Sequence, residues 1–266
     1  MSTIMGGLYG DGIIALKGAY PHARVEELAE DIQTLFQEAL QRPGGALARG
    51  PSRYYVEVHP ERLRGFVGLV SHPWVQTVCE NVLGPDYKLV EVGFDVPGPG
   101  AQRQPWHRDF RAPEETVRGR RLNSLAFNIT TVDVTEDMGP LEIAPGTQWD
   151  EWPDFEQGMF PPRARYPRYE QLAVRKMPQR GDVSARSALT IHRGTENRSS
   201  KSRPALVLGF DAPDAHNAER HDLQVTKAYA DTLSEDLKRH LAYRLVVAPE
   251  PIVQAHTIGG LMMADS

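Results

Sequence analysis

The amino-acid sequence predicts a mainly β fold with flanking helices (α+β). From residue 88 to residue 210, short stretches of β-branched and aromatic residues alternate with Gly/Pro turns, a pattern typical of a sandwich or barrel. Helical apolar spacing occurs before this stretch, within residues 20–85, and after it, at about 232–246. We therefore expect a single domain over residues 1–266, with a β core, an N-terminal helical brace and a C-terminal helix.

The N-terminal part combines one short strand with two helices. Residues 12–16 form an apolar run that suits an early strand. Apolar side chains recur at i, i+3, i+4 and i+7 over residues 25–39, which indicates an amphipathic helix that ends before Pro43. Residues Pro73–Leu83 repeat this spacing. We expect both helices to pack their apolar faces on a sheet.

Five short strands are expected in the core. They cover residues 89–96, 124–132, 141–144, 188–192 and 205–210. Near the C-terminus, Thr232 and Glu235 fit a capping box, in which each side chain bonds the other residue's backbone N–H. Leucines spaced by four residues follow, and they indicate the C-terminal helix.

The stretch 149–177 is rich in Pro, Arg and aromatic residues and shows no clear period. Long loops in a compact domain are usually functional, so this stretch is a candidate substrate lid. We expect its aromatic residues to form an apolar wall around the substrate, namely Trp149, Trp152, Phe155 and Phe160. Contacts to an anionic group are expected from Arg163, Arg165 and Arg168. The alternative is a solvated loop whose aromatic residues pack on the outside of the core.

The composition excludes several classes of protein. Apolar residues make up 40% and charged residues 24%, as in soluble globular proteins, and the net charge of −5 argues against a nucleic-acid binder. Cys79 is the only cysteine, so neither an intramolecular disulfide nor a cysteine zinc site is possible. No signal peptide or apolar run of membrane-spanning length is visible. We expect a cytoplasmic protein that acts without a membrane.

A His-x-Asp pair with one distant His is the most informative pattern. His107 and Asp109 form the pair, and His192 follows far downstream. Two histidines and one carboxylate are the ligand set of a facial triad, which holds a non-haem Fe(II) and leaves positions open for a co-substrate and O₂. Arg203, eleven residues after the second His, could grip a carboxylate of 2-oxoglutarate. Taken alone, the pair could also be a surface His beside a solvated Asp.

Further segments extend this pattern in a fixed order. A strand that ends in a Pro-Gly-Thr turn covers 139–147, an Arg-Gly-Asp triplet at 180–182 precedes the strand expected to end in His192, and 197–204 leads to Arg203-Pro204. Together these segments resemble the phytanoyl-CoA dioxygenase family of Fe(II)/2-oxoglutarate-dependent oxygenases. The resemblance is good over 88–210 and looser before it. It implies a double-stranded β-helix core, the jelly-roll architecture of the cupins.

The resemblance also implies roles for individual residues. It makes His107, Asp109 and His192 the iron ligands, with 2-oxoglutarate and O₂ as co-substrates. Arg203 matches the arginine that pairs with the distal carboxylate of 2-oxoglutarate, a task that suits a planar guanidinium better than an ammonium group.

Four further positions concern the co-substrate. Gln104 and Thr147 match residues that hydrogen-bond 2-oxoglutarate in some members, although either side chain could instead satisfy local backbone groups. Two positions depart from the family pattern: Gln148 stands where a His is common, and Gly194 stands where some members have Ser. These departures suggest a different set of hydrogen bonds to the co-substrate.

The expected activity is oxidation of a small molecule, most simply hydroxylation, with release of succinate and CO₂. Natural-product metabolism is one setting in which the family acts. Related halogenases lack the carboxylate ligand, so the presence of Asp109 disfavours halogenation. Two alternatives stay open: a cupin-like metalloenzyme that does not use 2-oxoglutarate, and a catalytically silent member that binds a ligand. Arg203 argues against the first, and the complete triad argues against the second.

Overall fold

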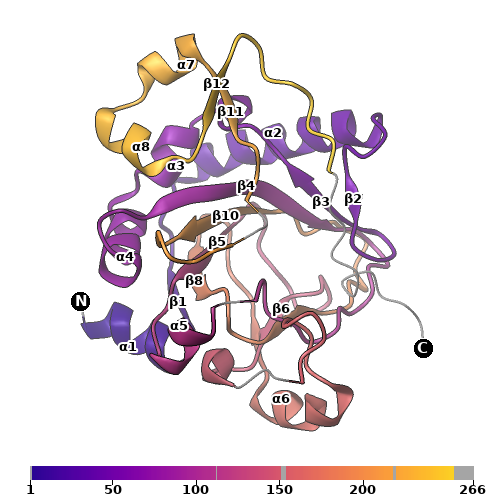
Figure 1. The fold of residues 1–266 in the computed structure, drawn as a ribbon. Coiled ribbons are helices and arrows are strands. Elements are labelled where there is room, and N and C mark those ends of the chain that lie inside the picture. The colour runs from indigo at the N-terminus through magenta and orange to yellow at the C-terminus, as the bar shows by residue number, and fades with distance from the viewer. Residues whose placement is uncertain (1, 112, 151–153, 218–219, 255–266) are drawn as a thin grey trace.

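The computed structural model describes residues 2–111, 113–150, 154–217 and 220–254 (Figure 1). Trp152, one residue of the expected apolar wall, lies outside them. The helices are α1 (Ser2–Gly10), α2 (His22–Leu40), α3 (Phe66–Val70), α4 (Pro73–Leu83), α5 (Glu114–Arg118), α6 (Tyr166–Leu172), α7 (Lys227–Thr232) and α8 (Glu235–His240). Short 3₁₀ helices cover Pro60–Arg62, Thr147–Trp149 and Arg163–Arg165.

A seven-stranded antiparallel sheet forms the centre of the molecule, in the order β1-β8-β5-β10-β4-β3-β2. Its strands are β1 (Ile13–Leu16), β2 (Leu47–Ala48), β3 (Arg53–Glu57), β4 (Lys88–Pro97), β5 (Ser124–Thr130), β8 (Val183–Ser187) and β10 (Ala205–Asp211). A three-stranded sheet has the order β7-β6-β9, from β6 (Leu141–Ile143), β7 (Val174–Lys176) and β9 (His192–Gly194). Strands β11 (Gln224–Thr226) and β12 (Arg244–Val246) pair in parallel.

The two faces of the large sheet have different neighbours. Along β4, Val92 and Phe94 belong to one apolar cluster with α2 and α4, whereas Glu91 and Asp95 line a cavity on the opposite face. This division follows from the alternation of side chains along a strand. Helices α2 and α3 lie on one side of the sheet, and β6 and α6 lie on the other (Figure 1). The architecture is mainly β with flanking helices, as the sequence pattern predicts, and it is the double-stranded β-helix that the family resemblance implies.

The longest helix, α2, shows why the helical brace forms. Val25, Leu28, Ile32 and Leu35 are buried on one face, and their spacing of three and four residues brings them into line against the sheet. The opposite face is polar. Among the described residues, no helix combines the length and the apolar character that crossing a membrane requires.

Two of the expected elements are wrong. Residues 188–191 form a turn between β8 and β9, so His192 opens a strand instead of closing one. The expected C-terminal helix at 232–246 is instead two short helices followed by β12. Ser234, not Thr232, caps α8, because its hydroxyl accepts the Leu237 N–H at 3.1 Å.

The N-terminal brace contains more than helices. Strands β2 and β3 extend the large sheet beyond β4, and helix α1 precedes the first expected strand. The strands at 89–96, 124–132, 141–144 and 205–210 are present, with ends that differ by one or two residues.

Candidate metal centre and its cavity

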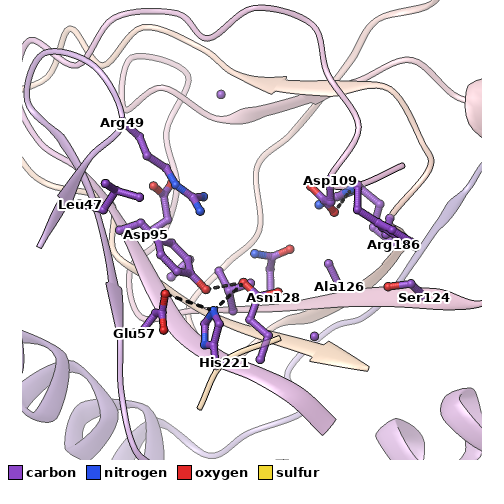
Figure 2. Close-up of a pocket in the computed structure, with 18 of the residues that line it drawn as sticks. Leu47, Arg49, Glu57, Asp95, Asp109, Ser124, Ala126, Asn128, Arg186 and His221 are labelled. Atoms are coloured by element: carbon purple, nitrogen blue, oxygen red, sulfur yellow. Dashed lines mark hydrogen bonds and ion pairs between the residues drawn. The ribbon is translucent and has the colours of Figure 1, made fainter. Parts of the chain in front are cut away.

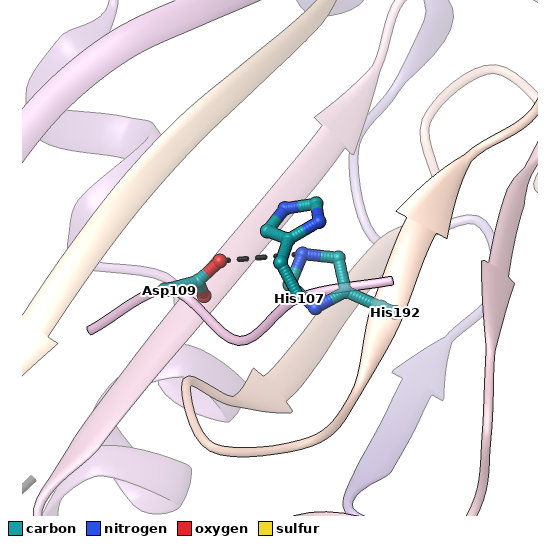
Figure 3. Close-up of side chains that lie close together, drawn as sticks. All are labelled: His107, Asp109 and His192. Atoms are coloured by element: carbon teal, nitrogen blue, oxygen red, sulfur yellow. Dashed lines mark ion pairs between the residues drawn. The ribbon is translucent and has the colours of Figure 1, made fainter. Parts of the chain in front are cut away.

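The expected triad comes together at one end of the cavity (Figure 3). One ligand atom from each of His107, Asp109 and His192 lies within 4.8 Å of the other two. Residue 107 pairs with residue 192 through two backbone hydrogen bonds of 3.0 and 2.9 Å. This pairing places the two imidazole rings 4.3 Å apart, although 85 residues separate them in the chain.

Both imidazoles are anchored through the same nitrogen. His107 Nδ1 lies 2.9 Å from the Pro105 carbonyl oxygen, and His192 Nδ1 lies 2.9 Å from the Thr190 carbonyl oxygen. A carbonyl oxygen only accepts, so these shorter contacts favour a proton on each Nδ1 and a free lone pair on each Nε2 for a metal, although Arg186 Nη1 also lies 3.2 Å from His192 Nδ1. These tautomers make the pair a suitable ligand set for a divalent ion.

The carboxylate of Asp109 is held from two sides. Its Oδ1 lies 3.2 Å from His192 Nε2, and its Oδ2 lies 2.9 Å from Nη1 of Arg186 on β8. Burial opposes the charged carboxylate, but the Arg186 guanidinium and the histidines outweigh it and hold the pKa of Asp109 well below its usual range.

Burial and nearby charges keep the two histidines neutral. Burial lowers the pKa of His107 well below its ordinary value, and the neighbouring His192 lowers it further. Burial and Arg186 lower the pKa of His192 in the same direction. Two neutral imidazoles beside one ionised carboxylate are the protonation states that metal binding requires. The donor set therefore fits a non-haem iron ion of the facial-triad type.

The cavity has a volume of about 620 Å³, which is within the range of small-molecule sites. It extends from Asp109 and Arg186 across the sheet to Glu57 and His221 (Figure 2). Near the triad its wall is apolar, from Phe110, Met159, Phe160 and Ala188. Its floor includes small residues from β5, β8 and β10, namely Ala126, Ser184, Ala205 and Gly209.

A basic group lines the cavity at the edge where β9 meets the first ligand segment. Arg203 and Arg53 are both buried there, with Asp95 Oδ2 3.9 and 3.4 Å from their guanidinium nitrogens. Burial lowers the pKa of Arg203 to about 10 despite the attraction of Asp95. Arg53 Nη2 and Nε are buried and make no hydrogen bond to the described residues, so this guanidinium retains donors for a ligand.

Gln104 lies beside these two arginines, and its side-chain oxygen already accepts two hydrogen bonds. Oε1 accepts hydrogen bonds from Arg53 Nη1 at 2.8 Å and from the Gly194 N–H at 2.9 Å. The amide Nε2 is the part of this side chain that can bind a co-substrate. The absence of a side chain at Gly194 also has a cause, because a Cβ there would come within 2.2 Å of Arg53 Nη1.

Thr147 does not reach the cavity, and this corrects its expected contact with 2-oxoglutarate. The residue is fully buried and is not among the residues that line the cavity. Its hydroxyl donates to the Ala144 carbonyl at 2.7 Å and accepts the Ile191 N–H at 3.0 Å. With both functions used, Thr147 positions the residue before His192. Gln148 also points elsewhere, and its Nε2 donates to the Tyr9 and Gly10 carbonyls at 3.0 Å each.

The candidate lid divides into two parts. Met159 and Phe160 line the cavity, and the Phe160 ring centroid is 6.1 Å from that of His107. Phe155 packs in a small apolar cluster with Trp106 and Tyr169. Met159 and Phe160 therefore form part of the wall of the site, and Phe155 packs behind them.

Of the other described lid residues, Lys176 lines the cavity, whereas Trp149 and the three expected arginines do not. Trp149 packs against Tyr9 with ring centroids 5.7 Å apart. Arg165 pairs with Asp154 at 2.7 Å, and Arg168 pairs with Asp150 at 2.8 Å. The residues that line the cavity do not include Arg163, Arg165 or Arg168. The expected contact of these arginines to an anionic substrate group stays a prediction, because it would require them to move from these positions.

Sequence reasoning missed Arg53 and Arg186. A local signal exists for Arg186, which is a charged residue inside the short stretch 183–187 of small and apolar residues, and a buried charge usually has a partner. Arg53 has no such signal, because it lies 51 residues before Gln104 in the chain and meets it only through the pairing of β3 with β4.

Comparisons with known proteins identify the family of the chain and solved structures that share its fold. The model of the phytanoyl-CoA dioxygenase (PhyH) family matches residues 8–205, which is more than half of the chain. No curated protein sequence matches the chain significantly. The fold is shared with the epimerase SnoN in complex with Fe3+, alpha ketoglutarate and nogalamycin RO, at 16% identity and a TM-score of 0.64, over 79% of this chain and 82% of that one.

Two further solved structures share the fold. One is the non-heme alpha ketoglutarate dependent epimerase SnoN from nogalamycin biosynthesis, at 17% identity and a TM-score of 0.62, over 79% of this chain and 80% of that one. The other is EctD from S. alaskensis with 2-oxoglutarate and 5-hydroxyectoine, at 16% identity and a TM-score of 0.64, over 81% of this chain and 77% of that one.

Proposed function

The chain belongs to the phytanoyl-CoA dioxygenase family of non-haem iron- and 2-oxoglutarate-dependent enzymes, and from this premise we propose a role for each residue of its site. His107, Asp109 and His192 hold the Fe(II) ion through two Nε2 atoms and one carboxylate oxygen. The observation that carries this assignment is the convergence of the three ligand atoms within 4.8 Å, with both Nδ1 atoms bound to backbone carbonyls.

The basic group binds the co-substrate. Arg203 pairs with the distal carboxylate of 2-oxoglutarate, since a buried guanidinium recognises a carboxylate through two parallel hydrogen bonds. Arg53 supplies its unused donors to the same anion, and the Gln104 amide supplies one more. Asp95 keeps the two arginines at a fixed separation because it lies near both.

The reaction that fits the site is the hydroxylation of a small molecule. When bound, iron with 2-oxoglutarate and O₂ supplies the oxidation, and succinate and CO₂ are released. The chain binds and orients the substrate and excludes water from the reacting atoms. Phe110, Met159 and Phe160 form the apolar wall that does this next to the ligands. Because Asp109 occupies the carboxylate position, hydroxylation or a related oxidation is favoured over halogenation.

An anaerobic titration tests this proposal. Fe(II)-loaded protein is titrated with 2-oxoglutarate while the weak visible charge-transfer band of the chelate is recorded. We expect the band in the wild type, no band in Asp109→Ala, and a band that requires about tenfold more 2-oxoglutarate in Arg203→Ala. The control is Arg121→Ala, which removes an exposed arginine paired with Asp214. Iron binding without any band would move the assignment to a cupin-like metalloenzyme that does not use 2-oxoglutarate.

A further inference from the structure

The far end of the cavity carries a group of acidic residues that the oxidation does not require. We call this group the acidic end, and it consists of Glu57, Glu91 and Asp211, with Tyr55 and His221 beside them. Figure 2 shows Glu57 and His221 on the side of the cavity opposite Asp109 and Arg186. The acidic end therefore faces the part of a substrate that lies away from the iron ligands.

Two of these carboxylates have no basic partner other than a histidine. His221 Nε2 lies 3.8 Å from Glu57 Oε1 and 3.9 Å from Glu91 Oε1, distances too long for a hydrogen bond. Tyr55 donates its hydroxyl to Glu91. No lysine or arginine of the described chain forms an ion pair with either glutamate. Arg49 lies over the Tyr55 ring, with its guanidinium carbon 3.9 Å from the ring centroid, so the pair brings negative charge into the cavity without a direct ion pair to a lysine or arginine of the described chain.

The environment of Asp211 is a second, independent observation at the acidic end. Its side chain is 1% exposed, the Ser124 and Asn217 side chains are its hydrogen-bonding neighbours, and neither carboxylate oxygen accepts a hydrogen bond of ideal geometry from the described residues. Its nearest cation is Arg220, whose Nε lies 3.5 Å from Oδ2. Burial raises the pKa of Asp211 to about 6 although the hydrogen bond from Ser124 and the charge of Arg220 lower it, and the charge of Glu91 adds to the effect of burial. A buried carboxylate in this state is best satisfied by a cation that enters the cavity.

The cation that fits is organic, not a second metal ion. Within the described residues, three potential ligand atoms converge closely enough for a metal only at His107, Asp109 and His192. The acidic end instead spreads its carboxylates over three neighbouring strands, β3, β4 and β10. Widely spaced acceptors suit an alkylammonium group, which has several N–H donors that point in different directions.

The floor of the cavity makes room for these side chains and sets their distance from the triad. A Cβ at Gly209 would lie 2.6 Å from Glu91 Oε2, and one at Gly93 would lie 2.4 Å from the Tyr55 hydroxyl. Glu91, Gly209, Ala126 and Arg186 are successive partners across four adjacent strands. Strands lie about 4.8 Å apart, so the Glu91 carboxylate above Gly209 is on the order of 10 Å from the Arg186 backbone.

We propose that the substrate carries an amino group, protonated at neutral pH, which binds between Glu57, Glu91 and Asp211 while the carbon to be oxidised lies at the triad. This inference rests on the proposed oxygenase function and names the substrate class of the same site. The separation of the two ends means that the oxidised carbon is not adjacent to the amine. Small residues along the floor leave space for the body of such a molecule.

Three probes of one shape test the proposal: phenylbutylamine, phenylbutanol and phenylbutyrate. Their affinities are measured by calorimetry for the anaerobic Fe(II)- and 2-oxoglutarate-loaded protein. We expect the amine to bind at least about tenfold more tightly than the alcohol or the acid, as one charge-assisted contact provides. Glu57→Gln and Glu91→Gln should each remove most of this preference. Glu80→Gln, on the exposed face of α4, changes the net charge equally and should preserve it.

The outcomes are distinct. Equal binding of the three probes, tighter binding of the acid, or no binding of any probe overturns the proposal. An amine preference that both glutamine variants retain also overturns it. The charge-transfer band is recorded on the same samples, so a missing band identifies failure of the oxygenase assignment. A normal band without amine preference identifies failure of this inference alone. Thermal melting of each variant verifies that the loss is not caused by unfolding.

Discussion

Arg186 Nη1 lies 2.9 Å from Asp109 Oδ2, and this ion pair orients the only carboxylate among the three candidate iron ligands. Oδ1 of the same carboxylate faces His192, at 3.2 Å from its Nε2. One oxygen is thus held by the protein and the other is directed to the metal position. The pair explains why a charged residue is buried on β8, where the neighbouring side chains are small.

Removal of this guanidinium should weaken iron binding. In Arg186→Gln the carboxylate of Asp109 is free to turn, and loss of such an orienting partner typically costs about 10- to 100-fold in metal affinity. Fe(II) affinity is measured anaerobically by competition with a chelator. Arg193→Gln is the control, because Arg193 forms a buried pair with Glu142 at 2.7 Å and is not among the residues that line the cavity. Unchanged or tighter Fe(II) binding in Arg186→Gln would refute the orienting role.

Asp211 should make the stability of the fold depend on pH. Its folded-state pKa of about 6 exceeds the unfolded value near 4. The folded state therefore holds the proton more tightly, and stability is lost as pH rises through 6. The charged form then costs about 3 kcal/mol. Asp211→Asn should raise the free energy of unfolding by up to about that amount at pH 7.5, and by almost nothing at pH 4.

Urea unfolding at the two pH values measures this difference. Asp222→Asn is the control with the opposite sign, since hydrogen bonds from Arg244 and Gln224 lower the pKa of Asp222. The free energy of unfolding of Asp222→Asn at pH 7.5 should be equal to or lower than that of the wild type. A wild-type protein that is more stable than Asp211→Asn at pH 7.5 would show that Asp211 contributes a structural interaction.

A serine at position 194 should disturb co-substrate binding. Its Cβ would clash with Arg53 Nη1 at 2.2 Å, so the guanidinium must leave its place beside Gln104. We expect about tenfold weaker binding of 2-oxoglutarate in Gly194→Ser, measured by the anaerobic titration. In an Arg53→Met background the same substitution should have little further effect, because the two changes act on one contact. Additive losses would contradict this explanation.

Gly68→Ser is the matched control for that experiment, since a Cβ at Gly68 meets no heavy atom within 4 Å. It adds the same side chain on helix α3, far in the fold from the basic group. Wild-type 2-oxoglutarate affinity is expected.

Thr147→Val should affect stability and not co-substrate affinity. Valine has a similar shape but leaves the Ile191 N–H without its partner, and an unsatisfied buried donor costs about 1–3 kcal/mol. The free energy of unfolding from urea titration should fall by this amount, while the 2-oxoglutarate titration of the folded protein stays unchanged. A selective loss of 2-oxoglutarate affinity at unchanged stability would restore the role that the family resemblance implies.

Local patterns were sufficient where an element interacts mainly through one face. The apolar spacing of α2 and α4 predicts both helices because each packs a single stripe on the sheet. Local patterns failed where distant partners decide the structure. The residues 188–191 have strand-forming side chains, but Thr190 N–H bonds to Ser187 O and its hydroxyl bonds to Gly12 O, so the chain turns.

The C-terminal error has the same origin. Leucines at four-residue spacing fit a helix, yet Leu241 forms a bridge with Leu89 of β4 and ends the helical course. At the site, the motif spacing predicts which residues carry the chemistry. The partners Arg53 and Arg186 depend on strand register, which a single sequence does not reveal.

Arg108, between His107 and Asp109, connects the segment that carries these two ligands to the lid residues Asp150, Phe155 and Met159, which we call the cover. Its N–H donates to Met159 O at 3.1 Å, its Nη2 donates to Asp150 O at 3.0 Å, and its guanidinium lies 4.8 Å from the Phe155 ring centroid. The cover cannot swing outward without loosening the two ligands that flank Arg108. If iron binding fixes the two ligands and thereby favours the closed position of the cover, closing of the cover must favour iron binding by the same coupling free energy.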